Sequence, residues 1–264
     1  MSTAHAEQSI AMTAFAASVA LLFTISATIT VVWCASMSAM GGMPMTGGWT
    51  MSMMWMRMPG QTWIGVGASF LGMWLVMMVA MMLPSLALPL LRYRDALAAA
   101  GETRRGWLTL LVGLGYFSTW MVVGLAIFPF GVALADLEMQ QPALSRAVPI
   151  ASGLVVLLAG AVQFSAWKMR QLACCREESG VRLPAAGGWS AWRRGLRYGL
   201  DCGPCCANLM AILLVIGVMD LYAMAGVTAA IAVERFAPAS ERAVRAIGAV
   251  VIAAGLSLIA RAVV

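Results

Sequence analysis

Long runs of apolar residues recur along this chain and constrain its fold more than any other feature. A helix of about 20 apolar residues can cross the hydrocarbon core of a bilayer. Six such runs are present, over residues 10–35, 62–91, 107–133, 147–167, 204–233 and 244–261. With 62% apolar and 11% charged residues, the chain has too few charges to cover a soluble globule. No run alternates polar and apolar residues as a transmembrane strand does. The sequence therefore predicts an all-α, polytopic membrane helical bundle that forms a single domain over residues 1–264.

The basic residues predict the orientation of this bundle. Loops on the cytoplasmic side of a membrane protein carry the excess of Lys and Arg. Eleven of the 17 basic residues lie in two of the segments between apolar runs: Arg92, Arg94, Arg104, Arg105, Lys168, Arg170, Arg176, Arg182, Arg193, Arg194 and Arg197. We expect these segments and the N-terminus to lie in the cytoplasm, with the protein in a bacterial inner membrane. The net charge of +6 then reflects topology and not binding of nucleic acid.

The run over residues 204–233 allows two interpretations. As one helix it is about 45 Å long at 1.5 Å per residue, which exceeds the bilayer core unless the helix tilts. Arg235, Arg242 and Arg245 then lie outside, against the charge rule. A turn at residues 217–220 would return these arginines to the cytoplasm and raise the number of spans to seven. We favour six spans, because Gly217-Val218-Met219-Asp220 is a weak turn signal.

Methionine is concentrated in the segment that follows the first apolar run. Nine methionines fall within 22 residues: Met37, Met40, Met43, Met45, Met51, Met53, Met54, Met56 and Met58. The glycines and prolines between them predict an irregular, mobile loop outside the membrane. Thioethers are soft, neutral ligands that select Cu(I) over hard cations, which makes Met43 and Met45 candidate ligands. The alternative is that these side chains only fill irregular apolar surface.

The second apolar run continues the methionine pattern. Met73, Met77 and Met81 are spaced four residues apart, so their side chains stack along one face of a helix. These sulfurs could form a ladder into the membrane, although a methionine stripe at this spacing more commonly packs a core. Pro84 and Pro89 follow at the inner end of the run and free backbone carbonyls that another group must satisfy.

Cysteine forms the most specific pattern, Cys202-Gly203-Pro204-Cys205-Cys206. Pro204 suits the first turn of a helix, so the motif is predicted at a helix N-terminus, where the dipole favours the metal-binding thiolate. Cys174 and Cys175 lie in the preceding segment, on the same predicted side. In a reducing cytoplasm these five cysteines would not form structural disulfides. The alternative, inert core thiols, suits Cys34 better than this cluster.

Two acidic residues and one histidine complete the candidate set. Asp201 is adjacent to the cysteine motif and is more suited to capping a helix than to binding metal. Asp220 follows Met219 inside an apolar run, where the two could share a metal site or Asp220 could cap a turn. The single histidine, His5, nearly excludes a site that needs several imidazoles.

Two of these segments resemble a known family. The run Met77-Met78-Val79-Ala80-Met81-Met82-Leu83-Pro84-Ser85 is similar to the second-span signature of bacterial predicted metal-binding integral membrane proteins, a family of unknown function with copper-chaperone-like members. The cysteine motif is also similar, together with Asn208-Leu209-Met210 and Gly217-Val218-Met219-Asp220-Leu221, and the resemblance covers residues 63–236. It implies metal handling. The chain departs from the family at Tyr198, Ala207-Asn208, Asp220 and the adjacent Cys174 and Cys175, which affects the ligand set.

These features support three hypotheses. In the first, outer methionines capture Cu(I), the Met73/Met77/Met81 ladder conducts it and Cys202, Cys205 and Cys206 receive it, with a metal chaperone or another membrane subunit as a partner. In the second, Cys202 and Cys205 form a thiol–disulfide oxidoreductase motif, although the strands of a thioredoxin fold are absent. In the third, the chain is a non-catalytic subunit of a membrane complex. No ATP-binding loop is present, so we expect transfer of metal and not pumping.

Overall fold

The computed structural model describes residues 2–39, 41–177, 187–237 and 240–263; Met40 and Arg182 lie outside this part of the chain. Almost every element in it is a helix. In chain order the elements are α1 (Ser2–Ala39), β1 (Gly42–Pro44), β2 (Thr50–Ser52), the 3₁₀ helix η1 (Met53–Trp55), α2 (Trp63–Ala99), α3 (Arg105–Gln140), α4 (Pro142–Val162), α5 (Ala166–Glu177), α6 (Gly188–Ile216), α7 (Leu221–Phe236) and α8 (Ser240–Val263). This confirms the predicted all-α class.

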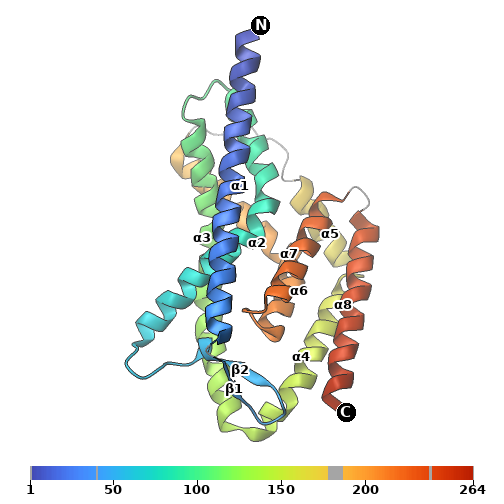
Figure 1. Cartoon of the computed structure of the whole chain (residues 1–264). Coiled ribbons are helices and arrows are strands. Elements are labelled where there is room, and N and C mark those ends of the chain that lie inside the picture. Colours follow the sequence, from blue (N-terminus) through green and yellow to red (C-terminus); the bar gives the residue numbers. More distant parts are fainter. Residues whose placement is uncertain (1, 40, 178–186, 238–239, 264) are drawn as a thin grey trace.

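Six helices in the described residues are long and apolar enough to cross a membrane, which agrees with the predicted polytopic bundle. They are α1 from Ala11, α2, α3, α4, α6 and α8 from Glu241. The helices run up and down side by side, and the β1–β2 hairpin lies at the end opposite the N-terminus (Figure 1). We call the end with this hairpin the methionine end and the opposite end, where α2 meets α3, the basic end.

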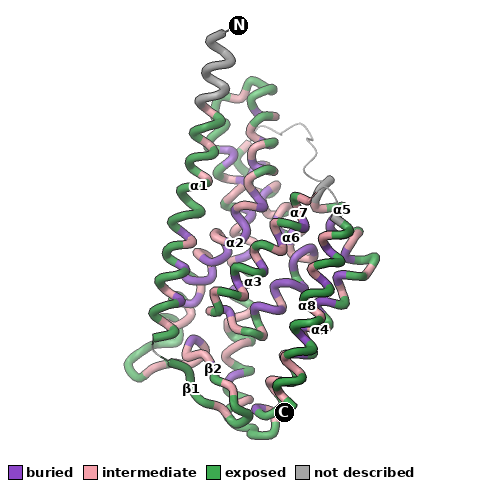
Figure 2. Tube along the Cα trace, turned by 45° about the vertical axis from the view of Figure 1, so that its right-hand side comes forward, coloured by how far each residue is buried: buried purple, intermediate pink, exposed green. Residues whose placement is uncertain are grey.

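The central helix of the bundle is α2. More than half of its most apolar stretch is buried by other helices, whereas α1 and α8 are exposed along most of their length. Figure 2 shows this contrast, with buried segments of α2 enclosed between more exposed outer helices. The methionine stripe of α2 therefore lies in the core and not on the lipid-facing surface.

The chain turns back within the run that was expected to form one span over residues 204–233. Helix α6 ends at Ile216, and Gly217 adopts a φ of +136°, a conformation open to glycine because it has no Cβ. The Asp220 side chain then accepts a hydrogen bond from the Ala223 N–H at 2.8 Å and begins α7. The single-helix interpretation of this run is wrong. The 16-residue α7 returns toward the basic end (Figure 1). Arg235 lies in the last turn of α7, and Arg242 and Arg245 lie in the first turns of α8.

Small residues bring α6 close to α3. A side chain at Gly195 would overlap the carbonyl oxygen of Val112, and one at Gly115 would overlap the carbonyl oxygen of Trp192. Membrane helices commonly pack through such small residues because their backbones can then approach closely. This contact places the residues that follow Gly115 on α3 directly against the cysteine motif of α6.

Candidate metal centre

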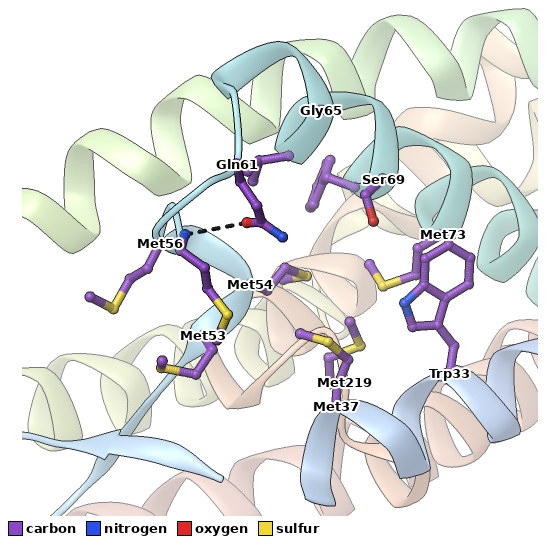
Figure 3. A pocket seen from close by; sticks show the side chains of 13 residues that line it. Trp33, Met37, Met53, Met54, Met56, Gln61, Gly65, Ser69, Met73 and Met219 are labelled. Carbon is purple, nitrogen blue, oxygen red and sulfur yellow. Dashed lines mark hydrogen bonds between the residues drawn. The ribbon is translucent and has the colours of Figure 1, made fainter. Parts of the chain in front are cut away.

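A cavity of about 140 Å³ lies at the methionine end and is lined by methionines from four separate segments. Figure 3 shows Met37 of α1, Met54 of η1, Met73 of α2 and Met219 of the α6–α7 turn extending toward one another. We call this space the methionine cavity. Its full lining is Trp33, Met37, Met53, Met54, Met56, Met58, Gln61, Gly65, Val66, Ser69, Phe70, Met73 and Met219. Seven thioethers thus surround a single space at one end of the bundle.

The loop that supplies four of these methionines forms two strands and a 3₁₀ helix and is hydrogen-bonded to the bundle, not irregular as expected. Its two short strands pair antiparallel, with Met43 opposite Met51. The Trp49 indole N–H donates to the carbonyl oxygen of Ser145 at 2.9 Å, and the Ser145 hydroxyl donates back to the Thr46 carbonyl at 2.8 Å. These bonds attach the hairpin to the start of α4. The hairpin therefore holds η1 over the end of the bundle.

Met43 and Met45, the loop residues selected as ligands, do not line the methionine cavity. Met43 lies in β1 with 40% of its surface exposed. Met45 belongs to the turn of the hairpin, where its backbone N–H bonds to the Trp49 carbonyl. The methionines of η1 and its flanks line the cavity instead. Sequence spacing could not distinguish them, because all nine occur in one run.

The stripe on α2 continues from the cavity into the core. Met73, Met77 and Met81 are each at most 4% exposed, and Met73 also lines the cavity. They belong to one continuous cluster of buried side chains. It also contains Met78 and Met82 of α2 and sulfur from other elements, namely Cys34, Met54, Met210, Met224, Cys202 and Cys206. The cluster connects the methionine cavity to the cysteine motif through buried residues.

Cys34 lies beside the methionine cavity, whereas Asp220 caps a helix outside it. The Cys34 sulfur lies 3.7 Å from the Met219 sulfur, at the edge of the methionine cavity, so this thiol belongs with the thioethers. Asp220 is exposed and caps α7, which is the capping alternative stated above. Only its neighbour Met219 reaches the cavity.

The cysteine motif lies inside α6 and not at a helix N-terminus, so the prediction that the helix dipole acts on these thiols is wrong. The helix begins at Gly188, and Pro204 occurs in its interior. A stripe of small residues spaced four apart, Ala191, Gly195 and Gly199, could have indicated that the helix begins earlier. These residues are buried, and Cys202 and Cys206 extend the same buried face of the helix. Prolines are tolerated inside membrane helices because neighbouring groups satisfy the freed carbonyls.

Cys202 and Cys206 form a buried pair, which we call the dithiol pair. They are four residues apart on one face of α6, with their sulfurs 4.0 Å apart and their residues 1% and 2% exposed. The hydroxyl of Tyr116, on α3, donates a hydrogen bond to the Cys202 sulfur at 3.1 Å. Two thiols and a phenol therefore meet in an apolar interior.

The other cysteines separate from this pair. Cys175 of α5 and Cys205 of α6 form a disulfide, whereas Cys174 is free and exposed. The expectation that these cysteines would form no disulfide is therefore wrong, and Cys205 pairs with Cys175 instead of Cys202. Because the side chain of Cys205 points to a different face of α6, it joins α5 to α6 and does not extend the dithiol pair.

A buried ion pair lies next to the disulfide. The Lys168 ammonium is 2.8 Å from the Glu234 carboxylate, and both side chains are at most 3% exposed. Lys168 also donates to the Cys205 carbonyl and, at 3.2 Å, to the Asn208 side chain, while Gln163 donates to Glu234 at 2.6 Å. All three donors of the ammonium are used, as a buried charge requires. The network links α4, α5, α6 and α7 behind the motif.

The next residue of α7, Arg235, shares a small pocket with Tyr116, whose hydroxyl contacts the dithiol pair. Its guanidinium donates to the Ser85 carbonyl at 3.1 Å. Ser85 lies four residues before Pro89, which has no N–H, so this carbonyl lacks its usual helical partner. This is one of the carbonyls that the prolines were expected to leave unsatisfied. The same pocket is also lined by Leu86, Pro89, Cys175, Tyr198 and Asp201.

No group of three or more His, Cys, Asp and Glu side chains with the arrangement of a metal site occurs in the described part of the chain. Thioethers are not among these four groups, and the dithiol pair supplies two sulfurs. Cu(I) is commonly bound by few soft ligands, so two thiolates at one end and several thioethers at the other remain compatible with it.

Comparison with known proteins adds one finding. The PpoB2 family model, described as a copper chaperone, matches residues 71–258, which include the α2 methionine stripe and every cysteine except Cys34. No curated protein and no solved structure matches the chain.

Proposed function

The chain belongs to the copper chaperone family, and from this premise we propose that it binds Cu(I) in the methionine cavity and transfers it to the dithiol pair. The observation that carries the proposal is the convergence of seven thioethers on one cavity. Methionines that only pack a core fill space, whereas these surround an unfilled one. Their sulfurs are neutral and soft, which suits the capture of a univalent soft cation at a membrane surface.

The distance between the two sites suits transfer along α2. Met73 lines the methionine cavity, and Leu86 lines the pocket beside the dithiol pair. At 1.5 Å per residue they are about 20 Å apart along the helix. The buried sulfurs of Met77 and Met81 occupy the interval. Thiolate binds Cu(I) more tightly than thioether does, so transfer toward Cys202 and Cys206 is downhill.

The predicted orientation gives this transfer a direction. If the basic end lies in the cytoplasm, as the distribution of Lys and Arg indicates, the methionine cavity faces outward and the dithiol pair lies closer to the cytoplasm. Copper would then move inward and pass to a metal chaperone or to another membrane subunit. The cargo is the metal ion itself, and no catalytic step is required.

Metal analysis of the purified protein tests the proposal. With ascorbate present to keep copper as Cu(I), we expect the detergent-solubilised wild type to retain copper after gel filtration. The double variant Cys202→Ser/Cys206→Ser should lose the tightly held fraction, and Cys174→Ser, which changes an exposed thiol, should not. A wild type that retains no copper, together with unchanged cellular copper in a deletion strain, would rule the proposal out.

The Cys175–Cys205 disulfide favours a second candidate, thiol–disulfide exchange. An external dithiol would be oxidised to its disulfide while Cys175 and Cys205 become thiols, with the two protons passing to their sulfurs. Rapid reduction by a thioredoxin-type dithiol in a protein that binds no copper would support this candidate over metal transfer.

A further inference from the structure

The positive charge of Arg235 lies beside the dithiol pair and is held there by the backbone of α2. The guanidinium shares a pocket with Tyr116, whose hydroxyl bonds to the Cys202 sulfur. Its charge therefore lies next to the phenol that contacts the Cys202 sulfur. The Ser85 carbonyl, freed by Pro89, accepts from the guanidinium at 3.1 Å and fixes its position.

The other charges around this pocket do not cancel that of Arg235. Within the described residues three ion pairs occur, Arg104–Glu102, Lys168–Glu234 and Arg245–Glu241, and Arg235 is in none of them. Lys168, which donates to the Cys205 carbonyl, is neutralised by Glu234 at 2.8 Å. Asp201 lines the same pocket, but it is only partly buried, so solvent screens its charge.

We propose that Arg235 makes the dithiol pair selective for a univalent over a divalent soft metal ion. This inference rests on the proposed function, because it assigns Cys202 and Cys206 as ligands. When Cu(I) binds, the two thiols release two protons, and two thiolates with Cu⁺ carry a net charge of −1. The guanidinium brings the total to zero. With Zn²⁺ or Cd²⁺ the two-thiolate complex is already neutral, so the site keeps the +1 that it has without metal and the guanidinium does not favour binding.

A comparison of two metals measures this selectivity. The full-length protein in detergent is titrated with Cu(I), held reduced by ascorbate, and separately with Cd(II), in competition with a chelator of known affinity for each ion. The thiolate-to-metal absorption band reports binding at the cysteines. The Cys202→Ser/Cys206→Ser variant gives the background from Cys34 and Cys174, which is subtracted.

We expect Arg235→Gln to lower the affinity for Cu(I) about 10- to 100-fold, the effect of one nearby charge at an effective dielectric constant of about 20. The affinity for Cd(II) should stay the same or rise. Arg235→Lys retains the charge and should restore most of the preference for Cu(I). Asp201→Asn removes an opposite charge from the same pocket and should shift the ratio a few-fold in the other direction.

The outcomes separate this inference from the proposed function. Equal losses for both metals would show that Arg235 only maintains the fold, and an unchanged ratio would show that its charge is irrelevant; either result overturns the inference alone. If Arg235→Gln does not fold, the Cu(I)-to-Cd(II) affinity ratio of Arg235→Lys decides, and a ratio at least 10-fold below that of the wild type overturns the inference, because the charge is retained there. A wild type without a Cu(I)–thiolate band overturns the proposed function as well.

Discussion

The hydroxyl of Tyr116 donates a 3.1 Å hydrogen bond to the sulfur of Cys202, and each of these residues is 1% exposed. The donor comes from α3 and the acceptor from α6, so the bond depends on the close approach of these helices at Gly115 and Gly195. A phenol that donates to sulfur stabilises the thiolate, the form that binds metal.

Tyr116→Phe should therefore weaken Cu(I) binding while preserving the fold. A hydrogen bond to a charged group contributes about 1.5–3 kcal/mol, which corresponds to a loss of roughly 10- to 100-fold in affinity. Competition with a chelator of known Cu(I) affinity measures this loss of affinity. Tyr93→Phe, at another buried tyrosine whose ring contacts Arg194, is the matched control and should leave the affinity unchanged. Equal effects of the two variants would contradict the role of the bond.

Replacing cavity methionines with leucine should slow copper capture without unfolding the protein. Leucine has nearly the volume of methionine but lacks the sulfur, and such swaps usually cost under about 1.5 kcal/mol. We expect Met37→Leu/Met54→Leu to reduce copper accumulation by cells at low external copper. Met43→Leu, on the exposed face of the hairpin, should behave as the wild type. Equal copper accumulation by the wild type, the double variant and Met43→Leu would show that the cavity methionines serve only as packing.

Gly195→Ala should destabilise the bundle, because the added methyl group would overlap the Val112 carbonyl oxygen. Overpacking of this kind costs about 1–3 kcal/mol. Gly203→Ala is the control on the same helix, where nothing lies within 4 Å of the new methyl group. It should be neutral or stabilising by up to about 1 kcal/mol, since alanine favours helix. Thermal unfolding in detergent should give a lower Tm for Gly195→Ala only.

Removing one partner of the buried ion pair should be more harmful than removing both charges. Lys168→Met leaves Glu234 charged in the interior and should cost about 3–5 kcal/mol. In Lys168→Met/Glu234→Gln the buried charges are gone and the side chain can still accept from Gln163, so part of the loss should be recovered. The free energies of unfolding of the two variants are compared in detergent. A double variant less stable than the single variant would argue against this view of the pair.

The disulfide should be visible by differential labelling. Without reductant, a thiol-reactive maleimide should modify the exposed Cys174 and leave Cys175 and Cys205 unmodified. After dithiothreitol, both should become reactive, and mass spectrometry of the peptides identifies them. Labelling of Cys175 before reduction would show that the pair is not oxidised in the isolated protein.

Much of the fold was predictable, because hydropathy and helical spacing are local properties of the sequence. Five of the six long helices and the α2 stripe of Met73, Met77 and Met81 follow from them directly, whereas the run expected over residues 204–233 is divided between α6 and α7. The methionine cavity does not, since it joins Met37, Met54 and Met219 from segments far apart in the chain. Their proximity depends on how the helices pack, which no local pattern records.

The cysteine motif was misplaced for a different reason. A proline is equally compatible with the first turn of a helix and with the interior of a membrane helix, so Pro204 alone could not distinguish them. The arginines and tryptophans of residues 189–197 also lower the hydropathy of the first half of α6, although its buried face continues through it. Periodicity was the better indicator here, and average hydropathy the poorer one.

The α6–α7 turn has a consequence for the two ends of the polypeptide. Because α7 brings the chain back before α8 begins, Ser2 and Val263 lie at opposite ends of the bundle (Figure 1). In a membrane that α7 crosses in addition to the six long helices, domains or tags fused to these two ends would occupy different compartments. A fluorescent protein that matures on only one side would report from one terminus and remain dark on the other.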